Sequence, residues 1–222
     1  MSKDFDGEFF PPIGIDWWRY YLSKGCSDSK HHKHHKSFIS NLGYSLQYLE
    51  FLDYQCREEP LHMTVHTLTV KTFVVTTMSV IEGLAFYLLT INGRGTMKEW
   101  EEVDTWISNS KKKDNVEIRV QSTLQRKLEK PLPDTMTLDV MIKKLEKSNL
   151  LSISRDDYKT LSYFRKLRNK VHVYDVSHYL DTDWNSFPIS KLGECKKVLG
   201  SFLRSEIFNP SEDDLSKLKW MG

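Results

Sequence analysis

The chain has little proline and little glycine: 7 prolines and 10 glycines among 222 residues. Because these residues mark turns, their scarcity indicates few turns and long secondary-structure elements. The chain has no internal repeat. The hydrophobic fraction of 39%, which includes 11 Phe, 10 Tyr and 6 Trp, is enough for a sizeable core. The composition therefore predicts one ordinary globular domain, with or without an extension.

Cysteine is also scarce, since only Cys26, Cys56 and Cys195 are present, far apart in the chain. Their spacing fits neither a metal site nor a redox pair. Three scattered free thiols are typical of a reducing cytosol. The first residues, Met-Ser-Lys-Asp-Phe-Asp, lack the apolar core of a secretion signal. We therefore expect a cytoplasmic protein.

The chain has no large excess of charge of either sign, because its formal net charge is +2 at pH 7. The overall charge thus predicts no strong attraction to nucleic acid. The local charge differs, since residues 137–171 hold nine Lys or Arg residues against four Asp or Glu residues. This basic segment leads into the most informative stretch of the chain, residues 165–174.

The apolar residues recur at helical spacing along most of the chain. Helices are expected at residues 37–59, 62–92, 96–109, 116–129, 137–148, 154–174 and 188–207. Ser154 stands three positions before Asp157, which is the spacing of a capping box. No alternating strand pattern extends beyond a few residues. The sequence therefore predicts an all-α fold, with a helical bundle at 37–207, an N-terminal extension at 1–36 and a tail at 208–222.

Residues 62–92 are apolar enough to suggest a membrane span. Lys71 and Glu82 interrupt the segment, however, and no basic flank sets an orientation. A central helix buried by its neighbours is the better interpretation, and we expect no membrane partner. A carboxylate on such a helix needs a partner, and an arginine is the natural one for Glu82.

Four histidines crowd into residues 31–36, and such a run could bind a transition metal. No carboxylate or cysteine nearby completes a metal site. A solvated turn or a helix start is therefore the expected role of this run.

Residues 165–174 read Arg-Lys-Leu-Arg-Asn-Lys-Val-His-Val-Tyr. At about 100° per residue, Arg165, Arg168 and His172 fall within an arc of roughly 60° on a helix. Two guanidiniums beside an imidazole can hold a phosphate next to a general acid/base. This strip borders the packing face of the predicted helix, and Asn169 lies at its outer edge.

A structural role is the alternative for the same residues. The arginines can pair with acids such as Glu82, while the histidine caps or packs. Basic residues near the C-terminus of a helix are also common because they interact favourably with the helix dipole. Helix spacing alone leaves both interpretations open.

The stretch from Leu161 to Tyr174 resembles the signature helix of the HEPN superfamily (higher eukaryotes and prokaryotes nucleotide-binding). Members carry an Arg, usually followed by a polar residue such as Asn, then four to six residues and a His. Arg165 meets this spacing. Arg168 and Asn169 match the Arg-polar pair, but only three residues separate Arg168 from His172. The resemblance covers roughly residues 37–207 and implies a HEPN-type helical bundle.

Many HEPN proteins are metal-independent endoribonucleases that act as toxins or in antiviral defence. The resemblance implies RNA as the substrate, no metal and no cofactor. It also implies a homodimer with the site at its interface, and an antitoxin or defence partner protein. His172 would transfer protons during attack by the 2′-OH, which leaves a 2′,3′-cyclic phosphate and a 5′-hydroxyl. Arg165 or Arg168 would stabilise the charge on the phosphorane, and Asn169 would orient the groups.

His172 and Tyr174 also resemble the His-x-Tyr of HEPN toxins that are paired with a minimal nucleotidyltransferase antitoxin. In those toxins the tyrosine is the target of modification, whereas a core tyrosine is the simpler interpretation here. Two other functions stay open. The first is a catalytically inactive HEPN-fold module that binds RNA, nucleotide or a protein partner, which the short spacing from Arg168 to His172 favours. The second is an unrelated helical interaction protein.

Overall fold

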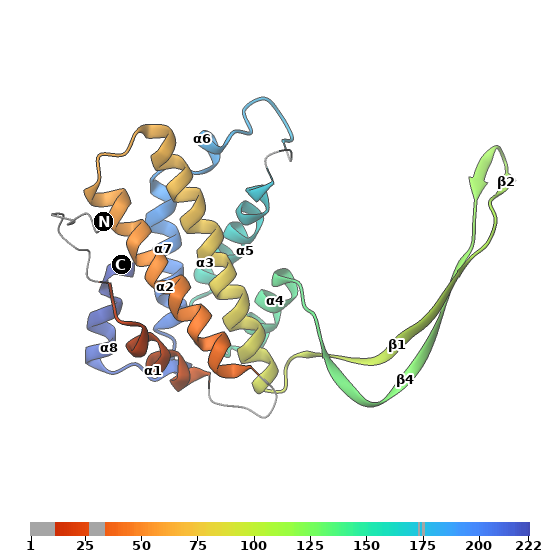
Figure 1. The fold of residues 1–222 in the computed structure, drawn as a ribbon, viewed down its shortest axis with the longest axis horizontal. Helices are drawn as coiled ribbons and strands as arrows, with labels where there is room; N and C mark the ends of the chain where they lie inside the picture. The colour runs from red at the N-terminus through yellow and green to blue at the C-terminus, as the bar shows by residue number, and fades with distance from the viewer. Residues whose placement is uncertain (1–11, 27–33, 173, 175) are drawn as a thin grey trace, which may run out of the picture.

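The computed structural model consists of a helical body and a long β arm that extends from it (Figure 1). It describes residues 12–26, 34–172, 174 and 176–222. The helices of the body are α1 (Ile15–Gly25), α2 (His35–Glu58), α3 (Met63–Ile91), α4 (Leu138–Ser148), α5 (Arg155–Arg168), α6 (Asp183–Ser186), α7 (Ser190–Leu203) and α8 (Glu212–Lys217). Short 3-10 turns at Asn169–Val171, Glu206–Phe208 and Leu218–Met221 follow α5, α7 and α8.

Helix α3 is the centre of the body, because α2, α4, α5, α6 and α7 all pack against it. Its buried side chains include Phe73, Ile81 and Leu88. By length and composition alone α3 could cross a membrane, a property that the core helices of folded domains share. The helices predicted at 37–59 and 62–92 are thus confirmed as α2 and α3, within about two residues at each end.

A single hydrophobic core extends from α1 to the last turn of the chain. Trp18 and Tyr21 of α1 are fully buried in the same cluster as α3, and so are Phe208 and Met221. The Tyr21 hydroxyl donates a hydrogen bond to the carbonyl of a residue at the end of α7. Residues 12–26 of the predicted extension and residues 208–222 of the predicted tail therefore contain parts of the core, while residues 1–11 and 27–33 lie outside the described residues.

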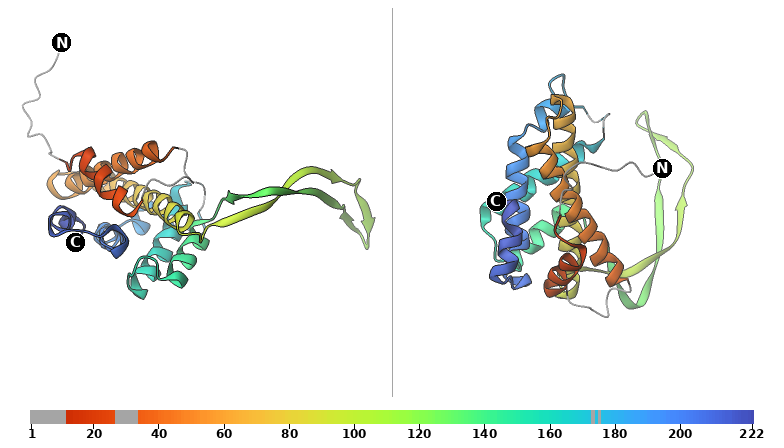
Figure 2. Two further views of the ribbon diagram at one scale, coloured as in Figure 1. Left: turned by 90° about the horizontal axis from the view of Figure 1, so that it is seen from below. Right: turned by 60° about the vertical axis from the view of Figure 1, so that its left-hand side comes forward.

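Four strands, in two antiparallel pairs, form the arm. β1 (Thr96–Ile107) pairs antiparallel with β4 (Gln121–Asp134), and β2 (Lys111–Lys113) pairs antiparallel with β3 (Val116–Ile118) at the tip. In the left view of Figure 2 this ribbon leads away from the helices and twists along its length. None of its described side chains is buried, and none contributes to the core cluster.

The all-α prediction is therefore wrong, because β1 and β4 occupy the segments predicted as helices at 96–109 and 116–129. The register shifts between Lys98 and Trp100 and again between Glu102 and Asp104. Such bulges break the strict alternation of side chains that marks a strand in a sequence. The tip of the arm has a clearer signal for a hairpin in its sequence, the pair Asp114 and Asn115. These two residues have φ values of 51° and 64°. Two-residue hairpin turns require positive φ at both positions and favour these residue types.

Candidate functional site

Helix α5 carries the predicted site. Its N-terminal cap and its buried inner face fix the position of the helix. The Ser154 side chain accepts a hydrogen bond from the Asp157 backbone N–H, and the Asp157 carboxylate accepts one from the backbone N–H of Ser154, so the predicted capping box is confirmed. Tyr158, Leu161 and Phe164 are buried on the inner face. Because this face packs against α3, α4 and α7, the side chains at its border have fixed neighbours on those helices.

Arg165 reaches across to α4. Its Nη2 lies 3.0 Å from Oδ1 of Asp139, and its buried Nε has no hydrogen-bond partner in the described part of the protein. Lys143 donates a hydrogen bond to the other carboxylate oxygen of Asp139. That hydrogen bond and the nearby guanidinium hold the pKa of Asp139 below its usual range. Asp139 is therefore ionised at neutral pH and offsets the positive charge of Arg165.

Arg168 reaches in a different direction, to the central helix. Its Nη2 lies 2.7 Å from Oε2 of Glu82 on α3. The sequence indicates an arginine as the natural partner of this carboxylate, and the structure contains that ion pair. Both side chains are about one third exposed, and pairs of that exposure contribute only about 0–1 kcal/mol to stability. The pair thus positions Arg168 more than it stabilises the fold.

The predicted strip of Arg165, Arg168 and His172 on one helix is not formed. Helix α5 ends at Arg168, not near residue 174, and a 3-10 turn at Asn169–Val171 follows. His172 then has extended backbone, with φ −81° and ψ 110°. The local sequence favours this end, because asparagine and β-branched valine are weak helix formers. His172 therefore leaves the helical path and is exposed.

His172 lines a pocket of about 230 Å³ beyond the end of α5. The other lining residues come from the 3-10 turn, the following loop and α6: Lys170, Val176, Asp181, Thr182, Asp183 and Ser186. The pocket thus places an exposed imidazole beside one ammonium group and two carboxylates. The sequence analysis did not identify these two acids, and their only signal in the sequence is the spacing of two positions between Asp181 and Asp183.

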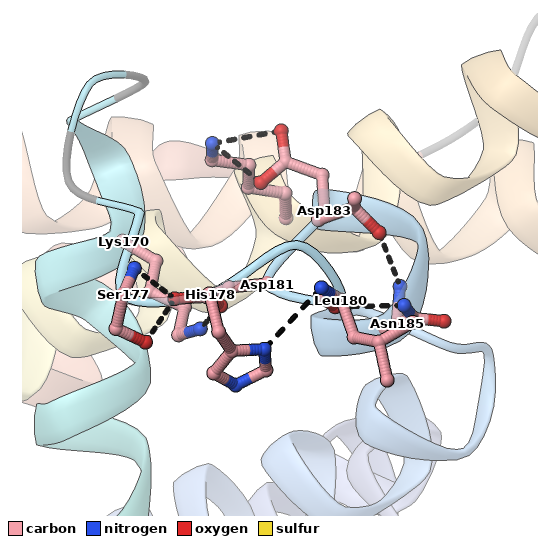
Figure 3. A network of polar contacts seen from close by, with 9 residues as sticks. Lys170, Ser177, His178, Leu180, Asp181, Asp183 and Asn185 are labelled. Atoms are coloured by element: carbon pink, nitrogen blue, oxygen red, sulfur yellow. Dashed lines mark hydrogen bonds and ion pairs between the residues drawn. The ribbon is translucent and has the colours of Figure 1, made fainter.

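Each of these carboxylates already has partners (Figure 3). Asp181 forms an ion pair with Lys170 and accepts hydrogen bonds from the backbone N–H and the hydroxyl of Ser177, at 3.2 and 3.0 Å. The Nζ of Lys71 on α3 lies 2.9 and 3.0 Å from the two oxygens of Asp183. These bonds tie the loop to α3 and to the turn that carries His172.

The remaining predicted residues lie at the surface. Asn169 is exposed at the end of α5. Tyr174 is 86% exposed, and its ring centroid lies 5.6 Å from that of His172. A core tyrosine is therefore the wrong interpretation for this position. The structure brings Tyr174 and His172 together, whereas Arg165 and Arg168 are held by different helices.

The metal-ligating and nucleophilic residues show no further site. Within residues 12–26, 34–172, 174 and 176–222, no group of three or more His, Cys, Asp or Glu side chains is placed to hold a metal ion. His31 and His32 lie outside the described residues, while His35 is buried with its Nδ1 2.8 Å from the Tyr87 hydroxyl. Burial raises the pKa of the Cys26 and Cys195 thiols to about 12, which leaves them as weak nucleophiles.

Chemically, the site combines one solvent-accessible imidazole with three cationic side chains whose charge is largely offset. An imidazole can accept and donate protons near neutral pH, and arginine can bind phosphate oxygens. A phosphate ligand would therefore have to compete with Glu82 for Arg168, or with Asp181 for Lys170. Comparison of the chain with protein-family models, with curated proteins and with solved structures gives no match.

Proposed function

We propose that the chain is a metal-independent endoribonuclease of the HEPN type, in which His172 transfers protons. The observation that carries the proposal is the exposed imidazole of His172, which lines a pocket. His172 stands four positions after Arg168 in the sequence. An exposed group in a pocket can reach a ligand, whereas a histidine that only packs would be buried. The resemblance of residues 161–174 to the HEPN signature supports the same reaction.

In this reaction His172 removes the proton of the 2′-OH, and the 2′-oxygen attacks the adjacent phosphorus. The bond from phosphorus to the 5′-oxygen breaks, and an acid returns a proton to that oxygen. The products are a 2′,3′-cyclic phosphate and a 5′-hydroxyl. One chain has one motif histidine, so the acid within one chain would be the Lys170 ammonium, which lines the same pocket. Arg168 stabilises the charge on the phosphorane once its guanidinium turns from Glu82 to the phosphate.

A second candidate function has an observation in its favour. Both motif arginines are paired with acids, Arg165 with Asp139 and Arg168 with Glu82. This pairing, and the end of the helix before His172, favour a HEPN-type module that binds RNA, nucleotide or a protein partner without cleaving. The exposure of Tyr174 supports access by a modifying partner protein under either function.

Cleavage of labelled single-stranded RNA by the full chain in the presence of EDTA tests the proposal. We expect 2′,3′-cyclic phosphate ends and a loss of about 100-fold or more with His172→Ala, which is the usual contribution of general acid/base catalysis. His178→Ala is the matched control, since it removes an exposed histidine from the same loop and should leave the rate unchanged.

Equal cleavage by the wild type and His172→Ala would exclude His172 as the proton-transfer group. A wild-type chain that binds the RNA without cleaving it would establish the second candidate instead. Arg168→Ala and Arg165→Ala then separate the two arginines, because only the one that contacts the phosphorane should lower the rate of cleavage without weakening RNA binding to the same degree.

A further inference from the structure

The β arm exposes apolar side chains that nothing in the body covers. They include two tryptophans, Trp100 and Trp106, at 48% and 53% exposure. The remaining large ones are Met97, Val103, Ile107, Val116, Ile118, Val120, Leu124 and Leu132. A two-stranded ribbon is only marginally stable in water on its own, and contiguous exposed apolar surface usually marks a contact with another molecule.

Charge is unevenly distributed along the arm. β1 carries four acids, Glu99, Glu101, Glu102 and Asp104, against one lysine. The tip carries Lys111, Lys112 and Lys113 in β2. Glu101 forms an ion pair with Arg126 of β4, but among the described residues Glu99, Glu102, Asp104 and the three tip lysines form none. With the β4 residues included, the stalk (residues 96–107 and 121–134) has six acids against four bases, and the tip (residues 108–120) has four bases against two acids. The stalk is thus net acidic and the tip net basic, and each can meet the opposite charge on another molecule.

The order of these features along the arm is symmetric. Trp106 and Ile107 lie midway in the chain between the acids at 99–104 and the lysines at 111–113. At about 3.3 Å per residue, the middle of the acidic cluster and the middle of the lysine cluster each lie roughly 15–20 Å from this apolar centre. An apolar centre flanked by charged groups is the usual layout of a protein interface.

We infer that two copies of this chain associate through their β arms, arranged antiparallel about a two-fold axis near Trp106 and Ile107. In that arrangement the lysine tip of each arm lies against the acidic stalk of the other. An isologous interface of this kind must be self-complementary, because each contact occurs twice. The arm is self-complementary, because its acids and its lysines lie at similar distances on either side of Trp106 and Ile107. A second copy of the chain therefore fits this surface better than an unrelated protein does. The inference does not depend on the proposed ribonuclease activity.

Nucleic acid is the main competing occupant, because exposed tryptophans and lysines can bind single strands. The arm from 96 to 134, however, has eight Lys or Arg residues and eight Asp or Glu residues, so it has no net charge. Affinity for a polyanion depends on neutralising its phosphates with excess positive charge. The acids of β1 would lie against the phosphates along half of the arm, and they oppose that binding.

A charge-swap experiment with the full chain tests the inference. The tip variant carries Lys111→Glu, Lys112→Glu and Lys113→Glu, and the stalk variant carries Glu99→Lys, Glu102→Lys and Asp104→Lys. Sedimentation or light scattering reports the mass. We expect a dimer for the wild type and monomers for each variant, because both contacts become repulsive. Mixing the two variants should restore a dimer of one copy of each, since tip and stalk again have opposite charges.

The apolar centre has a matched pair of variants. Trp106→Ser should raise the dimer dissociation constant about 10-fold or more, because tryptophans at the centre of an interface are among the residues that carry most of the binding energy. Trp184→Ser in α6 is the control: its side chain is equally exposed, at 51%, but lies on the body, so the dissociation constant should not change.

Three outcomes would overturn the inference. The first is a wild-type chain that is monomeric at micromolar concentration. The second is a dimer that survives both charge variants, which would place the contact elsewhere, for instance at α5. The third is a monomer whose arm binds single-stranded RNA, with that binding lost in the tip variant. RNA cleavage can be measured on the same variants, so a failure here is distinguishable from a failure of the proposed function.

Discussion

The body and the arm use the same apolar residue types in opposite ways. In the body, side chains such as Phe73, Trp18 and Phe208 are fully buried in one cluster. In the arm, side chains such as Trp106 and Leu124 are about half exposed and touch no core. Burial of apolar surface drives folding, so the body holds the folding free energy. The arm's apolar side chains stay available for association.

The largest expected effect comes from truncating the centre of the body. Phe73→Ala removes a fully buried ring from α3 and should lower the free energy of unfolding by about 3–5 kcal/mol. Leu124→Ala in β4 is the arm counterpart and should change it by less than about 0.5 kcal/mol. Urea unfolding followed by circular dichroism measures both. Similar losses for the two variants would mean that the arm belongs to the same cooperative unit as the body.

A buried ion pair gives the next largest effect. Asp214 lies in the first turn of α8, where its carboxylate accepts hydrogen bonds from Ser211 and lies 2.6 Å from the Nζ of Lys24 on α1. Asp214→Ala should lower the free energy of unfolding by about 3 kcal/mol, since it leaves the lysine and the cap unpaired. Asp213→Ala is the matched control, because Asp213 forms only an exposed pair with Lys217 and should change the stability by less than about 1 kcal/mol.

The same carboxylate sets a pH dependence. Burial raises its pKa, but the hydrogen bonds from Lys24 and Ser211 outweigh burial and lower the pKa of Asp214 to about 2 from an ordinary value of 3.8. A group with a depressed folded pKa stabilises the fold above its unfolded pKa, and that stabilisation is lost as the pH falls through the folded pKa. The wild type should therefore lose stability between about pH 4 and pH 2, and Asp214→Ala should lose less over that range. Parallel acid profiles for the two proteins would contradict this assignment.

Only a small effect is expected even from removing the whole arm. Replacing residues 97–133 by a short Gly-Ser turn keeps Thr96, whose hydroxyl accepts a hydrogen bond from Lys144 on α4. Because no described arm side chain contributes to the core, the free energy of unfolding should change by less than about 1 kcal/mol. The comparison is made at a concentration where both proteins are monomeric. A shortened chain that no longer unfolds cooperatively would show that the body needs the arm.

Sequence periodicity predicted most helices of the body, because their apolar faces are buried on one side, but it did not predict α1 within residues 1–36. The helices α2 and α3 and the capping box at Ser154 are found where the pattern places them. The arm was missed for two physical reasons. It has no buried face to impose alternation, and its bulges near Trp100 and Asp104 shift the side chains out of phase.

The candidate site was predicted in part. Periodicity places Arg165 and Arg168 at the border of the packed face, and the charge of Glu82 indicates its partner. Helix α5 ends at Arg168 because the helix propensities of the residues that follow are weak. A helical wheel assumes that the helix continues and therefore cannot predict this end. The bonds of Asp181 and Asp183 to Lys170 and Lys71 depend on how the loop returns to α3, which only tertiary structure determines.

The two ends of the arm are neighbours, since Thr96 pairs with Asp134. This pairing bears on the speed of folding. Helices α3 and α4 pack together although the whole arm separates them in the chain. A β-hairpin closes in about 1–10 μs, earlier than most tertiary contacts. Once closed, it shortens the effective loop between the two helices and lowers the entropic cost of their docking by about 1–2 kcal/mol. Because the arm has already lost that entropy on closing, the free energy of unfolding is unchanged, and the effect is on the rate at which α3 and α4 dock.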